Sequence, residues 1–358
     1  MKSRRLHEEV WVEAAVASRR SGKGEGSQGL RSPVLAALDL GTNNCRLLVA
    51  RASGRGYRII DAFSRIVRLG EGLTRSGVLA EDAMRRTIEA LKVCAGKISR
   101  RGVTHARNVA TEACRRAANC DEFLGRVRAE TGLDIEIITT AEEAQLAFRG
   151  CSPLLSPRQP RALVFDIGGG STELGWLRLR NGRPPELIDS MSVPLGVVTI
   201  SENYGRCHVP AALYGRIVQD ISGHMAAFAE RNGIGPRVAA DAVQMLGTSG
   251  TVTTLAGIHL GLARYDRSLV DGTYLDFAAI RSISRGLAEM TYEERSRLSC
   301  IGTDRADLVV AGCAILEAIC NLWPVGRLRV ADRGVREGIL DGLLNNARRR
   351  QPTAGAAE

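Results

Sequence analysis

Short apolar runs that end in an acidic residue and a glycine-containing loop stand out along the chain. The run 163–167 contains Asp166 near its end and is followed by three glycines, two hydroxyl residues and a second acid. The run 34–40 has Asp39 at the corresponding point, and the run 243–246 leads into a third glycine-containing loop. Apolar runs of this length bounded by glycine are typical of buried strands. Their recurrence in both halves predicts an imperfect internal repeat.

Elsewhere the apolar positions alternate between strand-like and helix-like spacing. We expect strands at 34–40, 45–51, 57–69, 106–110, 134–138, 162–166, 172–179, 186–193, 243–247 and 327–331, and helices at 80–101, 112–130, 141–149, 197–205, 210–231, from 250, 276–289, 304–322 and 335–348. Each half thus begins with a meander of three strands and then alternates helices with strands. This order predicts an α/β protein with a mixed sheet in each half, flanked by helices. A ligand would bind in the cleft between the halves.

The chain is long enough for two domains and has polar ends. Residues 1–32 are rich in glycine, serine and arginine, which predicts a disordered leader, although 7–19 is compatible with a short helix. The remaining segments are a first domain at 33–141, a second at 142–336, a last helix at 337–350 that is expected to pack back on the first domain, and a polar tail at 351–358.

The net charge of +10 indicates an anionic partner. Residues 1–32 and 341–358 account for four of these charges, so the body is basic as well. Polyphosphate, a nucleotide or nucleic acid would fit, and a solvated arginine-rich surface is the alternative interpretation. Aromatic residues make up only 4% of the chain and do not alternate with basic residues, so nucleic acid is the weaker option.

Neither a membrane span nor a secretion signal is predicted. The most apolar long segment, 306–323, contains Asp307 and Glu317 and is better explained as a buried helix. Acidic residues interrupt the N-terminal segment where a signal peptide would need an apolar core. The nine cysteines include no CxxC pair, which favours reduced thiols in a cytoplasmic protein.

The three loops have the composition of phosphate-binding turns, because glycine allows close approach of the backbone and successive N–H groups attract anionic oxygens. Their candidate residues are Gly41, Thr42, Asn43 and Asn44; Gly168, Gly169, Gly170, Ser171 and Thr172; and Gly247, Thr248, Ser249 and Gly250. Each loop alone is also compatible with a tight turn. The acids beside the loops cannot bind phosphate directly, but they suit a divalent metal that bridges to it.

Seven motifs occur in an order that identifies a family. They are LDLGTNNCRLLVA, ATEACRRAANCDEF, IEIITTAEEAQLAF, VFDIGGGSTEL, LGTSGTVTTLAG, RADLVVAGCAIL and GVREGIL. Over residues 33–345 the chain resembles the exopolyphosphatase and guanosine pentaphosphate phosphohydrolase (Ppx/GppA) family of the actin-like ATPase superfamily. The resemblance implies two actin-like (ribonuclease H-like) domains with the active site in the interdomain cleft. The chain resembles the short form, which lacks a C-terminal domain with a His-Asp metal motif.

The resemblance assigns roles to several acids. Glu143 is the expected general base that activates water, and Glu142 is a further candidate. The alternative is that both are first-turn acids stabilised by the helix dipole. Asp166 and Glu173 are the expected carboxylates for Mg²⁺, which takes one or two carboxylates together with water and phosphate oxygens. Asp39 is expected to hold the metal through water, and a turn-stabilising role is the alternative.

Arginines in the family motifs are candidate phosphate clamps, because a guanidinium binds phosphate bidentately and keeps its charge. We expect Arg46 and Arg115 in this role and consider Arg336 a third candidate. Arg305 and Asp307 also match a motif, but they are expected to form an ion pair at a helix start. The five histidines show no metal-ligand spacing.

The resulting hypothesis is a Mg²⁺-dependent exopolyphosphatase that releases terminal phosphate by in-line attack of water. Hydrolysis of guanosine pentaphosphate (pppGpp) is the nearest alternative. An acceptor kinase of the same superfamily and an inactive nucleotide-binding regulator are more remote. Inorganic polyphosphate or guanosine pentaphosphate would be the partner, and a homodimer is compatible with this hypothesis.

Overall fold

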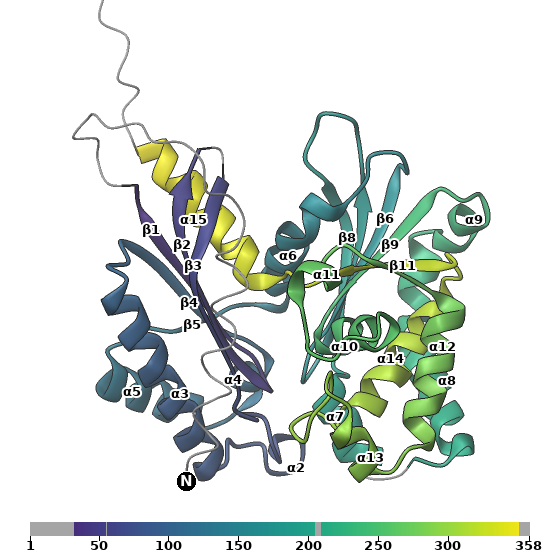
Figure 1. Cartoon of the computed structure of the whole chain (residues 1–358), viewed down its shortest axis with the longest axis horizontal. Helices are drawn as coiled ribbons and strands as arrows, with labels where there is room; N and C mark the ends of the chain where they lie inside the picture. The colour runs from purple at the N-terminus through teal and green to yellow at the C-terminus, as the bar shows by residue number, and fades with distance from the viewer. Residues whose placement is uncertain (1–31, 55, 205–208, 351–358) are drawn as a thin grey trace, which may run out of the picture.

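Two mixed sheets, each flanked by helices, form the two halves of the computed structural model (Figure 1). It describes residues 32–54, 56–204 and 209–350, except the side chain of the last one. The leader 1–32, with its candidate helix at 7–19, and the tail 351–358 therefore lie outside the described residues, apart from position 32. We call the first sheet with its helices the first lobe, and the second sheet with its helices the second lobe.

The first sheet has the strand order β3-β2-β1-β4-β5. Its strands are β1 (Val34–Leu40), β2 (Asn44–Ser53), β3 (Gly56–Ile66), β4 (His105–Ala110) and β5 (Glu136–Ile137). The β1–β2–β3 meander is antiparallel, whereas β4 and β5 continue the sheet in parallel with β1. Side chains alternate along β1: Ala36 and Leu38 pack with helices α3 (Glu81–Arg100) and α5 (Cys120–Thr131), while Leu35 and Ala37 face the other core. This period of two buries both faces of the strand.

The second sheet repeats the plan with the order β10-β11-β9-β6-β7-β8. Its strands are β6 (Arg161–Ile167), β7 (Thr172–Arg178), β8 (Glu186–Val193), β9 (Val243–Thr248), β10 (Tyr274–Asp276) and β11 (Arg327–Ala331). Again the first three strands form an antiparallel meander, and β9 and β11 run parallel to β6. The expected α/β class with a mixed sheet in each half is confirmed.

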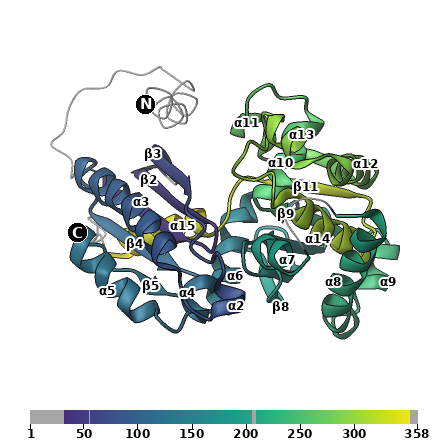
Figure 2. The same ribbon diagram turned by 90° about the horizontal axis from the view of Figure 1, so that it is seen from below.

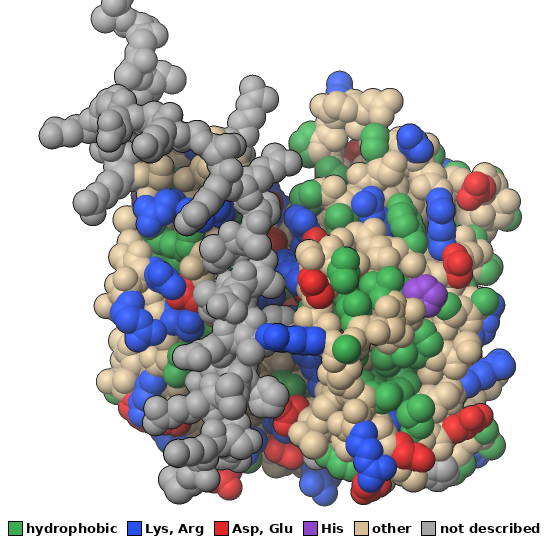
Figure 3. Space-filling model, in the orientation of Figure 1, with side chains coloured by type: hydrophobic (Ala, Val, Ile, Leu, Met, Phe, Trp, Pro, Cys, Tyr) green, Lys and Arg blue, Asp and Glu red, His purple; other side chains and the backbone are tan. Residues whose placement is uncertain are grey.

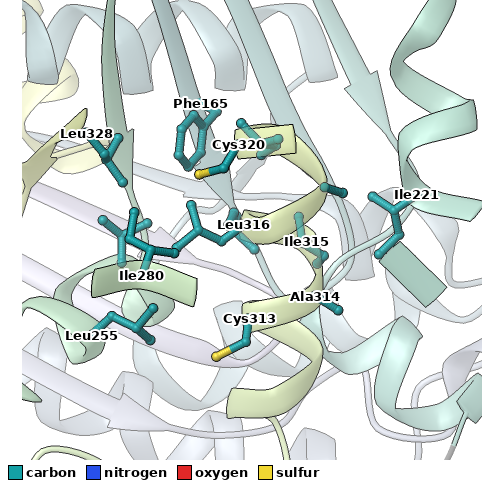
Figure 4. Packing of buried hydrophobic residues seen from close by; sticks show 14 of the residues in the cluster. Phe165, Ile221, Leu255, Ile280, Cys313, Ala314, Ile315, Leu316, Cys320 and Leu328 are labelled. Atoms are coloured by element: carbon teal, nitrogen blue, oxygen red, sulfur yellow. The ribbon is translucent and has the colours of Figure 1, made fainter. Parts of the chain in front are cut away.

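Helices cover one face of the second sheet with an apolar core. They are α8 (Ala211–Arg231), α10 (Gly250–His259), α12 (Phe277–Glu289) and α14 (Val309–Leu322). Figure 4 shows Ile315 and Leu316 of α14 among residues of the neighbouring helices, with Phe165 of β6 and Leu328 of β11 close by. All 14 residues of α14 are apolar or small except Glu317 and Asn321, as a helix enclosed by other elements requires.

Helices α6 (Thr140–Cys151) and α15 (Val335–Arg350) pack against each other beside the sheets (Figures 1 and 2). Their backbones touch through glycine. A Cβ atom on Gly338 would lie 2.0 Å from the Leu146 carbonyl oxygen, and one on Gly150 would lie 2.0 Å from the Gly334 carbonyl oxygen. Helix α15 also packs on β1 of the first sheet. The exact limits of the two domains stay a prediction.

The remaining elements are short. They are α2 (Leu73–Ser76), α4 (Glu112–Arg116), the 3-10 turn η1 (Ser152–Leu154), α7 (Val197–Tyr204), α9 (Ile234–Ala239), α11 (Arg267–Val270) and α13 (Tyr292–Arg297). Among the described residues, no helix has the length and apolarity needed to cross a membrane. The eight described cysteines are buried and free.

The largest differences from the expected helices occur in two places. The helix expected at 112–130 is divided into α4 and α5, because Ala117 is extended and the Asn119 side chain binds both backbone groups of Leu79. The helix expected at 304–322 begins only at Val309, since the preceding residues form turns that face the first lobe.

Candidate active site

A cavity of about 120 Å³ lies where loops of the two lobes meet. By volume it can hold several water molecules or a phosphate group. Its lining combines acids, arginines, glycines and hydroxyls: Asp39, Gly41, Thr42, Asn43, Asn44, Arg46, Thr111, Glu112, Glu143, Asp166, Gly168, Gly169, Gly170, Ser171, Ser249, Gly250, Thr251, Thr254 and Arg305, with a few apolar residues. Candidate residues from all three predicted loops thus share one cavity.

The first two loops are in direct contact across the lobes. A Cβ on Gly169 would lie 3.0 Å from the Thr42 Cβ, and one on Gly170 would lie 2.9 Å from the Thr42 Oγ1 and from the Glu112 Cγ. The Gly168 and Gly169 carbonyls accept hydrogen bonds from the first two amides of α7, at 3.0 and 2.8 Å. The glycines are therefore needed for the close approach of two backbones, in addition to any contact with a ligand.

Part of the predicted phosphate-binding set supports the loops and does not line the cavity. Thr172 Oγ1 donates to the Leu195 carbonyl at 2.7 Å, and Thr248 Oγ1 donates to the Arg333 carbonyl at 2.6 Å. Gly247 leaves room for the Phe165 ring, which would come within 2.4 Å of a Cβ there. The neighbouring Ser249 and Gly250 do line the cavity, at the N-terminus of α10. A helix N-terminus favours an anionic ligand.

Four acids line the cavity, one of which is Glu112, and a fifth acid, Glu173, is buried next to it. The other three in the lining are Asp39, Glu143 and Asp166. The Glu173 carboxylate is buried and accepts hydrogen bonds from Ser171 Oγ at 2.6 Å and Ser192 Oγ at 3.0 Å. Asp166 and Glu173 are paired across β6 and β7. The structure thus brings Asp39 and Asp166 to the cavity, while it does not bring the Glu173 carboxylate there.

Burial raises the pKa of Asp39, Glu143, Asp166 and Glu173. The pKa of Asp166 rises to about 7, because burial and the charge of Glu143 both disfavour ionisation. Burial and the charge of Asp166 raise the pKa of Glu173 to about 7. Burial and the charge of Glu173 raise the pKa of Glu143 to about 8, although the charge of Arg115 lowers it. Burial raises the pKa of Asp39 as well. Acids arranged in this way favour a bound cation.

The cavity's donor set fits Mg²⁺ with few protein ligands. Within the described residues no group of three or more His, Cys, Asp or Glu side chains has metal-binding geometry. Mg²⁺ usually keeps several waters and uses one or two carboxylates, which Asp39 and Asp166 could supply. Asn43 Oδ1 and Asn44 Oδ1 are buried acceptors without a hydrogen-bond partner among the described residues, and both side chains belong to the cavity lining. These all-oxygen groups suit a hard cation and its waters.

Arginines near the cavity fall into two groups. Arg46 and Arg305 line it, and Arg336 is half-buried in the first turn of α15. Within the described part of the chain, none of these three arginines forms an ion pair with a carboxylate. Burial, together with the charge of Arg46, lowers the pKa of Arg305 and of Arg336. Arg115 belongs to the other group: it donates to Glu143, Glu112 and the Ile138 carbonyl. It is not in the lining.

Glu142 faces away from the cavity and binds Arg107 at 2.6 Å. Successive residues of a helix point about 100° apart, so only one of two adjacent acids can face a given ligand. Thr139 caps the helix through its hydroxyl, which accepts from the Glu142 amide at 3.2 Å. The structure therefore places Glu143, and not Glu142, at the cavity.

Some lining residues were absent from the sequence-based set. They are Thr111, Glu112, Thr251, Thr254 and Arg305. The predicted ion pair between Arg305 and Asp307 is wrong, because Asp307 binds Arg68 of the first lobe at 2.8 Å. The family motif RADLVVAGCAIL was the available signal for Arg305, but sequence alone could not show which of its two charged residues faces the cleft.

Figure 3 shows lysine and arginine side chains on both lobes of the face drawn there. This spread agrees with the net charge of +10. A basic surface raises the local concentration of anionic ligands near the cavity.

The cavity between the two lobes combines acids with arginines that have no carboxylate partner among the described residues, and it suits a phosphate ligand. The profile of the Ppx/GppA phosphatase family matches residues 48–347, and the chain belongs to this family. It is 29% identical over 324 residues to Exopolyphosphatase 2 of Mycobacterium tuberculosis, covering 85% of this chain and 97% of that protein.

Solved structures of the family have the same fold. The Aquifex aeolicus Ppx/GppA family member superposes with a TM-score of 0.73 at 29% identity, covering 88% of this chain and 98% of the other. An exopolyphosphatase-like protein gives a TM-score of 0.79 at 27% identity, covering 89% and 99%. The expected family membership is confirmed.

Proposed function

We propose that the protein is a Mg²⁺-dependent exopolyphosphatase that removes the terminal phosphate of inorganic polyphosphate. The single observation that carries this proposal is the meeting of Glu143, Asp166, Arg46 and Arg305 in one cavity. A base, a metal carboxylate and phosphate-binding cations are the groups that phosphoryl transfer to water requires. The name of the M. tuberculosis relative supports the same reaction class.

In this mechanism Glu143 accepts a proton from the attacking water. The water oxygen forms a bond to the terminal phosphorus, the bridging P–O bond breaks, and its oxygen stays with the shortened chain. Arg115 fixes the carboxylate of Glu143 through a hydrogen bond of 2.7 Å. The raised pKa makes the ionised form of Glu143 a stronger base than an exposed carboxylate, as a general base working near neutral pH requires.

The remaining groups hold the phosphates. Asp39 and Asp166 would hold Mg²⁺, which offsets negative charge on the phosphate oxygens when it is bound. Arg46 and Arg305 supply charge to the same oxygens, and the N-terminus of α10 adds its dipole. Such preorganised electrostatic contacts supply most of the rate in phosphoryl transfer.

A direct assay tests the proposal. Purified protein with Mg²⁺ is offered long polyphosphate, guanosine pentaphosphate, and ATP with sugars, while free phosphate and sugar phosphate are measured. We expect phosphate release from polyphosphate that is lost in Glu143→Gln and retained in Glu142→Gln. Release from guanosine pentaphosphate alone would replace the proposed substrate with the nearest alternative. Sugar phosphorylation would point to a kinase, and no turnover to a regulator.

A further inference from the structure

An ion pair joins the two lobes beside the cavity. Arg68 follows β3 in the first lobe, and Asp307 precedes α14 in the second. Arg68 Nη1 donates to Asp307 Oδ2 at 2.8 Å, and Nη2 donates to Oδ1 at 2.9 Å. Nη2 also donates to the Asp304 carbonyl at 3.1 Å. The Asp307 side chain is only 10% exposed, so this bidentate pair is partly shielded from water.

On the first lobe, the backbone around Arg68 is hydrogen-bonded to the first predicted phosphate-binding loop, residues 41–44. The Val67 and Arg68 amides donate to the Asn43 carbonyl at 2.9 and 3.1 Å, and the Gly70 amide donates to the Thr42 carbonyl at 2.9 Å. A Cβ on Gly70 would lie 2.4 Å from the Thr42 Cγ2, so the two segments are in close contact. Any movement of this loop is therefore transmitted to Arg68.

The backbone of Arg68 is itself constrained. Its φ angle is 50°, in the left-handed region that favours glycine. A non-glycine residue persists there when the surrounding structure holds it, and such residues are concentrated at functional sites. Arg86 braces the segment by donating to the Val67 carbonyl at 3.2 Å. The arginine side chain is kept at a position where a glycine would fit more easily.

On the second lobe, Asp307 stands between cavity-lining residues. Arg305, Leu308 and Val309 all line the cavity. The Asp307 carbonyl is fixed by Ser201 Oγ at 2.9 Å. A second contact between the lobes lies nearby, where the Gly72 amide donates to Glu202 Oε1 at 2.7 Å.

We propose that the Arg68–Asp307 pair is a positioning latch that holds the lobes closed and sets Arg305 against the first phosphate loop. Because both ends of the pair are attached to cavity segments, closing the latch brings phosphate-binding groups of the two lobes to their working distance. Without it, the lobes separate more readily and substrate is held less tightly. The kinetic consequence rests on the proposed function, whereas the closure itself does not.

The variants distinguish the effect of the Arg68–Asp307 ion pair from the effect of backbone strain at Arg68. Arg68→Gly removes the side chain and suits the φ angle, so lost closure in this variant cannot be caused by strain. Asp307→Asn removes the charge from the other lobe while keeping the side chain's shape. The swap Arg68→Asp with Asp307→Arg restores opposite charges, and aspartate tolerates a positive φ. Arg126→Ala is the matched control, because Arg126 forms a bidentate pair with Glu81 at 2.8 and 2.9 Å within the first lobe.

Two measurements decide the outcome. Small-angle X-ray scattering, without ligand and with tripolyphosphate, should show a larger radius of gyration for Arg68→Gly and Asp307→Asn than for the wild type and the control. The swapped pair should return toward the wild type. With polyphosphate as substrate, the KM of the single variants should rise about tenfold with a smaller change in kcat, in line with the loss of one coupled pair.

Unchanged scattering in both single variants, with KM within twofold of the control, would overturn the latch. If both single variants open but the swap does not close them, the assignment to this pair is wrong. Absence of turnover in the wild type would refute the proposed function alone, since scattering would still decide whether the pair closes the lobes.

Discussion

Arg115 donates a hydrogen bond of 2.7 Å to Glu143, and the same guanidinium is also bound by Glu112 at 2.9 Å. Arg115, which was expected to clamp phosphate, therefore binds Glu143, which was expected to act as the general base. Its contacts fix the Glu143 carboxylate at the wall of the cavity, while Arg46 and Arg305 remain available to an anionic ligand.

The first prediction concerns the two adjacent glutamates. Glu143→Gln should lower kcat on the order of 10²- to 10⁴-fold, because the amide cannot accept the proton of the attacking water. Glu142→Gln should stay close to the wild type, since Glu142 binds Arg107 outside the cavity. Phosphate release under saturating polyphosphate is the measurement. Equal losses in the two variants would contradict this division of roles.

The second prediction distinguishes positioning of the base from binding of phosphate. Arg115→Ala should lower kcat by about 10- to 100-fold with little change in KM, because a misplaced base slows the chemical step. The charge of Arg115 also lowers the pKa of Glu143, so its removal should shift the acidic limb of the pH–rate profile to higher pH.

Arg305→Ala is the comparison for that variant. Arg305 lines the cavity and has no carboxylate ion pair among the described residues, so its loss should raise KM more than it lowers kcat. If Arg115→Ala raised KM while Arg305→Ala did not, the phosphate-binding role would belong to Arg115 after all.

Several features could be predicted from sequence because they depend on local patterns. The Asp39 and Asp166 loops follow apolar strands, and the meanders recur in the expected order. The direction of individual charged side chains could not be predicted in this way. Arg115 and Arg305 both lie in family motifs, but whether each faces a carboxylate or the cavity depends on residues far away in the sequence.

The break between α4 and α5 illustrates the same limit. Residues 112–130 have helical composition throughout, yet Asn119 binds the backbone of Leu79, which lies 40 residues earlier. Tertiary contacts of this kind override helix propensity, which is a weak local preference.

The third prediction follows from the buried acids. Burial raises the pKa of Asp166 from the ordinary 3.8, and that of Glu173 from the ordinary 4.5, to about 7 in the folded protein. Between about pH 4 and 7 the folded state therefore binds more protons than the unfolded state, and the free energy of unfolding falls as pH rises. In EDTA the melting temperature should drop on the order of 5 °C from pH 5 to pH 8.

Mg²⁺ should reduce this drop, because a cation beside Asp166 favours the charged carboxylates. Asp166→Asn should flatten the pH dependence and weaken the effect of Mg²⁺. Melting curves at each pH, with EDTA or with Mg²⁺, give both comparisons. A pH dependence that is the same in the variant and the wild type would show that Asp166 does not titrate in this range.

The fourth prediction concerns the contact between the helices that carry the site. Helix α6 presents Glu143, and α15 presents Arg336 at its first turn. Gly338→Ala would place a Cβ 2.0 Å from the Leu146 carbonyl oxygen and 2.8 Å from its carbonyl carbon. These are backbone atoms of α6 and cannot rotate away, so the helices must separate. We expect a loss of about 1–3 kcal/mol in the free energy of unfolding, as for an overpacked core.

Gly223→Ala in α8 is the matched control for Gly338→Ala, because a Cβ there meets no atom within 4 Å. Alanine is favoured over glycine in a helix, so this variant should be more stable by about 0.5–1 kcal/mol. Denaturant unfolding gives both values. Since movement of α6 displaces Glu143 as well, Gly338→Ala should also lower kcat at temperatures where the variant is fully folded. A variant that is destabilised but keeps its kcat would show that the helix contact supports the fold without setting the position of the base.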